Sequence, residues 1–292
     1  MVGMLLGCPV EAVLNALSLI NRRTLQLLFA VLFASVLARV SGSAQELGPK
    51  EIIERSAEVN RRDWDAAPGY DYFQRERNDE KIKTIEEIML AGSRYERLVA
   101  VGDKPLSPQD EAQEQHRFEK GIAQRQQESP SEREHRVGQY QKEIDRDHVL
   151  MGELTKALDF TLSGKEMLGR REVYVLKGTP RADYHPPNKQ AKALTGMQGT
   201  LWIDAANFHW VKAEAEVVHP VWIYGFVARI EPGTRFELEQ SPIAEGLWMP
   251  NHFIMDAKAT VFLLFPHYER DNITYFSYHK PGTSPAGTDD GR

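Results

Sequence analysis

The chain has 292 residues, of which 36 are Lys or Arg and 42 are Asp or Glu, so its formal net charge is −6. An acidic chain in which both charge signs are interspersed argues against binding to nucleic acid or to an anionic membrane, because both need a basic surface. We therefore expect no nucleic-acid partner.

The N-terminal segment is typical of an export signal. Arg22 and Arg23 precede an apolar run over residues 25–37, and the small residues 41–44 follow it. This is the three-part layout of a cleavable secretory signal. The run is shorter than the roughly 20 residues that a membrane-spanning helix needs. The sequence therefore predicts cleavage near Ala44, export to the periplasm and no stable transmembrane anchor.

Within the predicted signal peptide, residues 1–44, the first twenty positions fit this layout less well. They are apolar without positive charge and contain Cys8, the only cysteine. One explanation is an over-extended start, and the other is a lipoprotein acylated at Cys8. The segment beginning at Asn21 also faintly resembles a twin-arginine signal, although general secretion is the expected route. Cleavage leaves 33 basic and 41 acidic residues, a net charge of −8, and no cysteine for a disulfide or a metal.

Residues 45–280 are predicted to form a single domain that begins with a helix over residues 50–60. Ile52, Ile53 and Ala57 form an apolar stripe at helical spacing in this segment. After a break at Pro68, three strands are predicted, because the first segment alternates in polarity and turn dipeptides at residues 78–79 and 91–92 separate the three. These predicted strands are residues 70–77, 82–90 and 94–101.

A helical insertion is predicted at about residues 107–157. Ser107 and Ser131 each begin a capping pattern, which predicts helices over residues 108–127 and 132–157. The first helix is nearly all polar and is expected on the surface. The second carries an apolar stripe fit to pack on a sheet, and His148 on that stripe is expected to be a boundary core residue rather than a ligand.

The remainder of the domain is predicted to be a long antiparallel run, because the period returns to two. The predicted strands are residues 160–168, 170–178, 199–204, 210–219, 234–240, 247–258, 259–265 and 273–279. Residues 281–292 are rich in Gly, Pro, Ser and Asp and are predicted to be a disordered tail.

Two of the later segments, within residues 217–230 and 259–265, are apolar on both strand faces. One face of an antiparallel sheet is commonly wet, so such strands need cover on both sides. One explanation is a filled core sealed by the long helix. The other is a ligand cavity, and the residues predicted to bind the ligand are Trp222, Tyr224, Phe226, Phe262 and Leu264.

Motifs of catalysis and metal binding are not found in the sequence. It has no G-x-S-x-G, H-E-x-x-H, P-loop or dinucleotide-binding pattern, and its nine histidines show no metal-ligand spacing. Asp63 and Asp65 flank Trp64, and we expect this acidic pair to be a solvated surface. The sequence predicts a protein that is not an enzyme and uses no cofactor or metal.

Four short stretches resemble the LolA-like group of periplasmic proteins, which includes lipoprotein carriers, outer-membrane lipoprotein receptors and an envelope-stress sensor domain. They are residues 102–107, 169–176, 199–204 and 246–250, and the likeness is greatest to outer-membrane lipoprotein-sorting proteins. The resemblance implies an α+β fold, in which a curved antiparallel half-barrel sheet has helices covering its concave face. It also implies a hydrophobic cavity that accepts acyl chains.

We therefore expect a monomeric, cofactor-free periplasmic protein that binds a lipid, a lipoprotein acyl chain or another apolar envelope molecule. One alternative is a regulatory module that binds an envelope protein partner through the same half-barrel, with the charged insertion as the contact surface. A second alternative is a hydrolase whose acid and base come together only in the fold.

Overall fold

The computed structural model describes residues 47–283 except 79–80, 190, 224–226 and 263, and it leaves the side chains of residues 146–151 undescribed. The predicted signal peptide with Cys8, the side chain of His148 and most of the predicted tail lie outside the described residues. The described elements belong to one compact unit, Gly48–Arg292.

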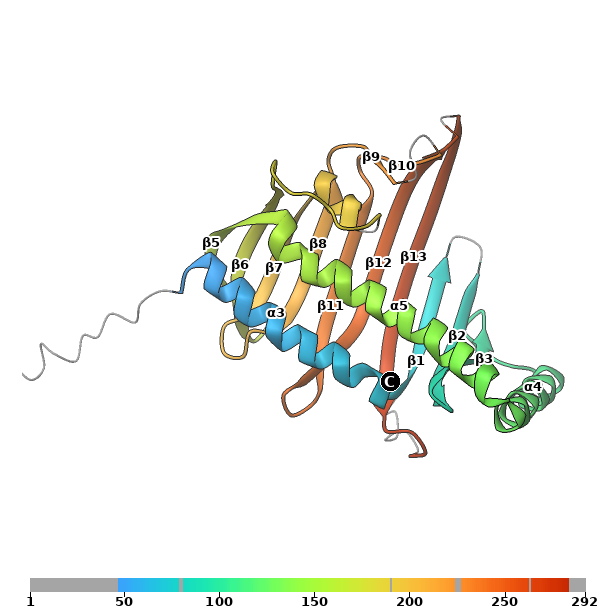
Figure 1. Ribbon diagram of the computed structural model, residues 1–292. Coiled ribbons are helices and arrows are strands. Elements are labelled where there is room, and N and C mark those ends of the chain that lie inside the picture. The colour runs from blue at the N-terminus through green and yellow to red at the C-terminus, as the bar shows by residue number, and fades with distance from the viewer. Residues whose placement is uncertain (1–46, 79–80, 190, 224–226, 263, 284–292) are drawn as a thin grey trace, which may run out of the picture. The chain divides into compact units, whose positions relative to one another are not determined.

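The unit is built on one antiparallel sheet (Figure 1). Eleven strands follow one another in the order β4-β3-β2-β1-β13-β12-β11-β8-β7-β6-β5, and β9 and β10 extend β12 beside this path. β4 and β5 are opposite edges, so the sheet is open. The strands are β1 (Asp71–Asn78), β2 (Ile82–Leu90), β3 (Ser93–Val101), β4 (Lys104–Pro105), β5 (Leu158–Leu168), β6 (Arg171–Pro180), β7 (Met197–Asp204), β8 (Trp210–Val217), β9 (Val221–Trp222), β10 (Ala228–Ile230), β11 (Arg235–Ala244), β12 (Leu247–Val261) and β13 (Phe265–His279).

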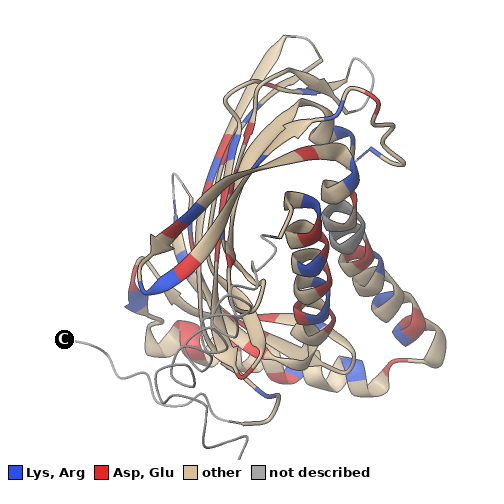
Figure 2. Ribbon diagram, turned by 90° about the vertical axis from the view of Figure 1, so that its left-hand side faces the viewer, with Lys and Arg blue, Asp and Glu red and all other residues tan. Residues whose placement is uncertain are grey.

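Two long helices, α3 (Pro49–Ala66) and α5 (Pro130–Ala157), lie on the same face of the sheet, and the sheet curves around them (Figures 1 and 2). The shorter elements are α4 (Pro108–Gln127) and the 3-10 helices η1 (Ala67–Gly69) and η2 (Ala191–Gly196). This arrangement confirms the α+β class expected from the sequence.

The length of α5 follows from the topology. After β4 the chain is at one edge of the sheet, and it must reach β5 at the other edge. Ten strand spacings of about 4.8 Å amount to roughly 48 Å. The 28 residues of α5 rise by about 42 Å in total at about 1.5 Å each. The helix therefore crosses nearly the whole sheet, and its length matches the number of strands beneath it.

The N-termini of α4 and α5 are capped by serines, and the sequence predicted one of these two caps correctly. The Ser107 side chain accepts a hydrogen bond from the backbone N–H of Asp110 at the start of α4. α5 begins at a capping box formed by Ser129 and Glu132, with Pro130 in the first turn. The prediction that Ser131 is the cap was wrong, because proline favours the first helical position and therefore places the cap before itself.

Buried apolar residues gather on α3 and on the strands toward the β5 edge of the sheet. Ile52 and Ile53 of α3 are 0% and 5% exposed, and Leu176 and Ile203 of the strands are both 0% exposed. By contrast, α4 has no buried residue among those that the structure describes, so the expected surface position of this polar helix is confirmed. It is attached beside β3 by Arg125, which donates to the carbonyl oxygens of Leu90 and Arg94.

The last hairpin differs from the prediction. Residues 247–258 and 259–265 were predicted as two strands, but residues 247–261 form the single strand β12, and β13 begins at Phe265 rather than at residue 273. The polar segment from Pro266 to Asn272 has the composition of a turn, yet Thr260 pairs with Pro266 and Ile254 pairs with Asn272. Pairing with the long neighbouring strand overrides the local polarity, which is why propensity alone misplaced the boundary.

Candidate functional site

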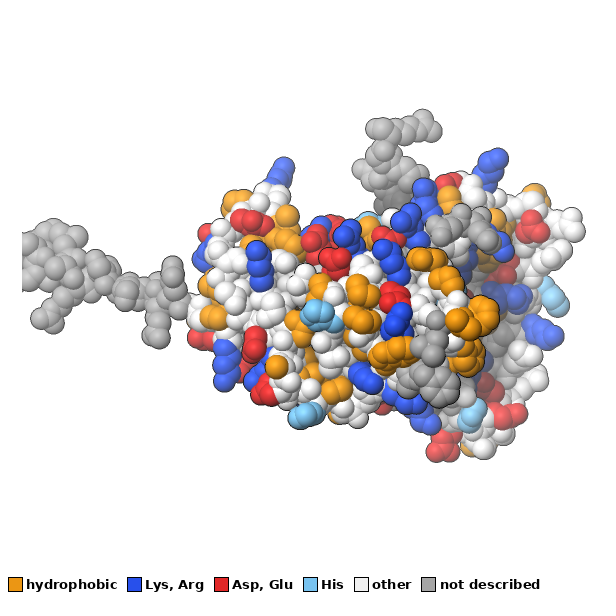
Figure 3. Space-filling view, turned by 90° about the horizontal axis from the view of Figure 1, so that it is seen from above, with side chains coloured by type: hydrophobic (Ala, Val, Ile, Leu, Met, Phe, Trp, Pro, Cys, Tyr) orange, Lys and Arg blue, Asp and Glu red, His pale blue; other side chains and the backbone are white. Residues whose placement is uncertain are grey.

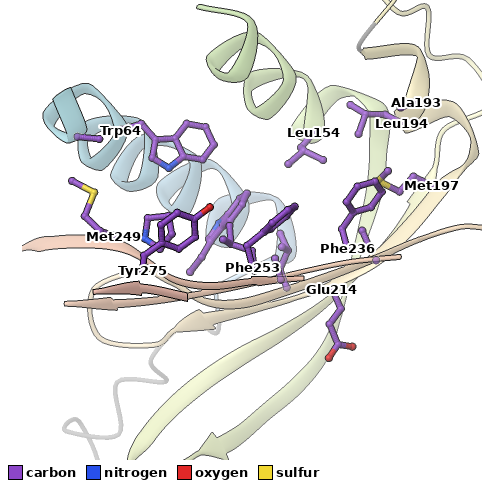
Figure 4. A pocket seen from close by; sticks show the side chains of 18 of the residues that line it. Trp64, Leu154, Ala193, Leu194, Met197, Glu214, Phe236, Met249, Phe253 and Tyr275 are labelled. Atoms are coloured by element: carbon purple, nitrogen blue, oxygen red, sulfur yellow. The ribbon is translucent and has the colours of Figure 1, made fainter. Parts of the chain in front are cut away.

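A cavity of about 790 Å³ lies between the two long helices and the sheet (Figure 4). This volume falls within the range of about 300–1,000 Å³ that is typical of small-molecule sites. Its walls are predominantly apolar. The helical side contributes Trp64, Ile144, Leu154, Ala193 and Leu194, and the sheet side contributes Leu158, Phe160, Met197, Leu201, Phe236, Leu238, Met249 and Phe253, among others.

The floor of the cavity is formed by alternate residues of neighbouring strands, which share one face of a sheet. Leu238 of β11 pairs with Ala213 of β8, and Phe236 pairs with Ala215. Ala215 in turn pairs with Gly199 of β7. Small side chains therefore alternate with large ones across these rows, and they leave space that the helices above do not fill.

Three charged residues line the cavity in the described part of the chain, namely Arg94, Glu143 and Glu214. The side chain of Glu214 points away from the cavity (Figure 4) and pairs with Lys212 at 2.8 Å. Arg94 donates to the carbonyl oxygens of Tyr70 at 2.6 Å and Ala67 at 3.0 Å. Its guanidinium is therefore already engaged where α3 passes into β1.

The end of the cavity near β1 and β13 is aromatic and carries hydroxyl groups. Tyr72, Tyr140, Tyr275 and Tyr278 line it. The Tyr72 ring centroid lies 5.9 Å from that of Tyr275 and 5.1 Å from that of Tyr278. Arg94 lies over the Tyr72 ring at 4.8 Å from its centroid.

A buried carboxyl group lies next to this tyrosine end. Glu87 pairs with Tyr72 across β1 and β2, is 6% exposed, and accepts a hydrogen bond from Gln74 Nε2 at 3.2 Å. Burial raises the pKa of Glu87 from 4.5 to about 7, with a smaller contribution from the negative charge of Glu96. The carboxyl group therefore changes charge near neutral pH.

We expect Glu87→Gln to be more stable than the parent at pH 8, by about 2 kcal/mol in the free energy of unfolding. Between pH 4.5 and about 7 the folded state binds a proton at Glu87 that the unfolded state has lost, so the stability of the parent falls as pH rises through this window. The variant should lack this slope in urea denaturation at pH 5, 6, 7 and 8. Glu86→Gln is the matched control, because Glu86 faces Arg97 at 3.5 Å instead. A parent whose stability did not fall between pH 5 and 7 would contradict the prediction.

A second cavity of about 520 Å³ adjoins the first beneath α3. Both are lined by Trp64, Leu154, Phe160, Leu201 and Trp210, so they are neighbouring parts of one interlayer space. The rings of Trp64 and Trp210 meet edge to face at 6.4 Å between centroids. This contact places α3 against the start of β8.

A buried acid and base connect α3 to the sheet beside this second cavity. Asp63 Oδ2 lies 3.2 Å from His209 Nε2, and the two residues are 2% and 5% exposed. The two atoms are within ion-pair distance but outside hydrogen-bond alignment. The His209 ring stacks on Trp248 at 5.0 Å, and Asn207 Oδ1 lies 2.9 Å from His209 Nδ1. The expectation that Asp63 belongs to a solvated acidic pair was therefore wrong, because α3 extends past residue 60 and turns Asp63 inward.

The residues predicted to bind the ligand lie away from both cavities where the structure describes them. Trp222 ends β9 and lies under Arg229, at 5.0 Å from its ring centroid. Phe262 and Leu264, in the β12–β13 turn, are 57% and 78% exposed. Tyr224 and Phe226 lie outside the described residues. The role of these five residues in binding stays a prediction.

The β12–β13 turn and the start of β13 carry most of the exposed large apolar residues of the described chain. Phe262, Leu264, Phe265 and Tyr268 are each more than half exposed. The face seen from above shows hydrophobic side chains lying among basic and acidic ones (Figure 3). The apolar character that the sequence analysis singled out is therefore a surface feature at this turn.

The described residues contain no group of three or more His, Cys, Asp or Glu that could hold a metal ion. No helix among them combines the length and the apolar character that crossing a membrane requires.

The fold and the site together define a class of protein in which a curved, open antiparallel sheet and the helices on one face enclose an apolar cavity. Solved structures similar to the chain at low TM-score include the following three. A LolA superfamily protein from Nitrosomonas europaea is 12% identical, with 82% of this chain and 96% of that chain covered and a TM-score of 0.32. An outer membrane lipoprotein-sorting protein domain from Vibrio parahaemolyticus is 10% identical, with 79% and 94% covered and a TM-score of 0.34. A chain from a MucA/MucB complex of Pseudomonas aeruginosa is 10% identical, with 78% and 99% covered and a TM-score of 0.22.

The resemblance to LolA-like proteins was inferred from the sequence, and LolA-like proteins are also among the similar solved structures. At these identities and TM-scores the similarity carries no argument about this chain. No protein-family model and no curated protein matches the chain.

Proposed function

We propose that this protein is an exported, periplasmic binding protein that holds an apolar envelope molecule, such as a lipid or a lipoprotein acyl chain, between its helices and its sheet. The observation that carries the proposal is the cavity of about 790 Å³ with its predominantly apolar walls. The predicted signal peptide supports the compartment.

The energetics of an acyl chain suit such a cavity. Each buried CH₂ contributes about 0.8 kcal/mol, so a dozen methylenes contribute about 10 kcal/mol. Association costs an estimated 4–15 kcal/mol in lost motional freedom, and contacts of the head group add to the favourable side. A single chain of this length therefore gives useful affinity without any covalent step.

The experiment is native mass spectrometry of the protein purified from the periplasm of producing cells, followed by solvent extraction and identification of what is released. We expect a bound apolar molecule. We also expect the delipidated protein to bind N-phenyl-1-naphthylamine, a fluorescent apolar probe. A protein that carries nothing and does not bind the probe would contradict the proposal.

One observation favours the alternative of a protein partner. The exposed Phe262, Leu264 and Phe265 offer an apolar contact outside the cavity, which is the kind of surface that interaction sites use. An empty cavity, together with co-purification of an envelope protein that Leu264→Asp abolishes, would support this alternative instead.

A further inference from the structure

The two ends of the main cavity differ in chemistry, and this difference bears on the ligand. At the end near β5 and β7 the walls include Leu158, Leu194 and Met197, which offer no hydrogen bond. At the end near β1 and β13 the walls are tyrosines. A ligand that fits both ends is an amphiphile, with its chain at the first end and its head at the second. This step rests on the proposed function.

The tyrosine end has hydroxyl groups to offer. Within the described chain, the hydroxyls of Tyr72 and Tyr275 have no hydrogen-bond partner, whereas that of Tyr278 donates to the carbonyl oxygen of Pro250 at 2.7 Å. The Tyr275 side chain rises from the sheet into the cavity, with its hydroxyl toward the helices (Figure 4). Burial raises the pKa of Tyr275 to about 12, so this hydroxyl keeps its proton and can both donate and accept.

The charges around this end disfavour an anionic head. Arg94 is the only cationic side chain among the described lining residues, and it already donates to two backbone carbonyls. The carboxyl groups of Glu87 and Glu143 lie near the tyrosines and influence Tyr140 electrostatically. A carboxylate or phosphate placed here would meet these groups and would lose its hydration without gaining a free cation.

A cationic head is disfavoured by a different contact. Aromatic rings bind cations over their faces. The guanidinium of Arg94 already lies over Tyr72, 4.8 Å from the ring centroid. A second cation at this ring cluster would be repelled by Arg94.

We propose that the cavity takes an uncharged amphiphile, whose hydroxyl- or carbonyl-bearing head binds at Tyr72 and Tyr275 and whose acyl chain lies toward Leu194 and Met197. Acylglycerols belong to this class, and free fatty acids and quaternary amines do not.

The experiment compares three ligands that carry a chain of the same length and differ in head charge. They are 1-monolauroylglycerol, laurate and dodecyltrimethylammonium, each used to displace N-phenyl-1-naphthylamine from the delipidated protein at pH 8. We expect the glyceride to displace the probe at about a tenfold lower concentration than either ion. We expect Tyr275→Phe to weaken the glyceride by about fivefold, the effect of one or two hydrogen bonds, with probe affinity and melting temperature unchanged.

Tyr268→Phe is the matched control, because it removes a hydroxyl from the same strand at a position 69% exposed and outside the cavity. Equal or tighter binding of laurate or of the quaternary amine would overturn the proposal. So would a Tyr275→Phe variant with full affinity for the glyceride. In both cases binding of the apolar probe would leave the proposed function standing, whereas a parent that binds no probe would remove the function itself.

Discussion

Replacing Phe253 by aspartate is expected to lower the affinity for an apolar ligand by at least about a hundredfold. Phe253 lies on β12, pairs with Leu238 of β11 and projects into the cavity (Figure 4). A carboxylate at this position must be desolvated whenever an acyl chain enters, and burying an unpaired charge costs several kcal/mol. A hundredfold loss corresponds to about 2.7 kcal/mol. The measurement is titration of parent and variant with N-phenyl-1-naphthylamine, with thermal melts in parallel.

Two further variants make this result decisive. Met167→Asp is the matched control, because it adds the same charge at an apolar residue that is 64% exposed and outside the cavity. It should bind the probe as the parent does. Ala213→Trp fills the floor of the cavity without adding charge, and it should also weaken binding. It provides the test of the cavity in case Phe253→Asp does not fold. Full affinity in Ala213→Trp and folded Phe253→Asp would mean that ligands bind elsewhere.

The second large effect is expected on stability. Asp63→Ala should lower the free energy of unfolding by about 3 kcal/mol, because it removes the carboxylate that faces the buried Nε2 of His209. Asp63 and His209 are 2% and 5% exposed, so water cannot readily replace the lost carboxylate. For a chain of this size the change corresponds to a melting temperature lower by about 10 °C. Thermal and urea denaturation both measure it.

Asp65→Ala provides the comparison two residues further along α3. Asp65 pairs with Arg61 at 2.7 Å, and their side chains are 49% and 57% exposed. An exposed ion pair of this kind is worth at most about 1 kcal/mol, so this variant should melt close to the parent. If both variants lost the same stability, the buried contact would be no stronger than the exposed one.

Much of the local structure could be predicted from the sequence because its signals are local. The boundaries of α4 and β2 agree with the prediction residue for residue. A serine–proline start marks α4, and turn dipeptides at residues 78–79 and 91–92 flank β2. The pairing of β1 with β13 could not be predicted in this way, because no pattern within either segment specifies a partner about 200 residues away. The family resemblance supplied the curved sheet instead.

The candidate site was harder to predict than the fold. Runs that are apolar on both faces pointed to Phe262 and Leu264, which lie on the surface, and their role in binding stays a prediction. The cavity depends instead on single residues from many strands, and on small ones such as Ala213 and Gly199 that leave space. No pattern within its own segment marks any of these residues as part of a cavity.

The burial of Asp63 could have been predicted, because it continues the buried stripe of Ile52, Ser56 and Asn60 at helical spacing.

The position of β13 in the sheet has a consequence for how this protein folds. β13 is the last of the described strands, yet it lies between β1 and β12, and among those strands it alone connects the N-terminal meander with the rest of the sheet. Until β13 is available, β1 and β12 each have one edge without a partner strand, and these edges can pair with other chains. Contacts between such distant segments form slowly. The nascent chain thus depends on protection from aggregation until its final strand is available.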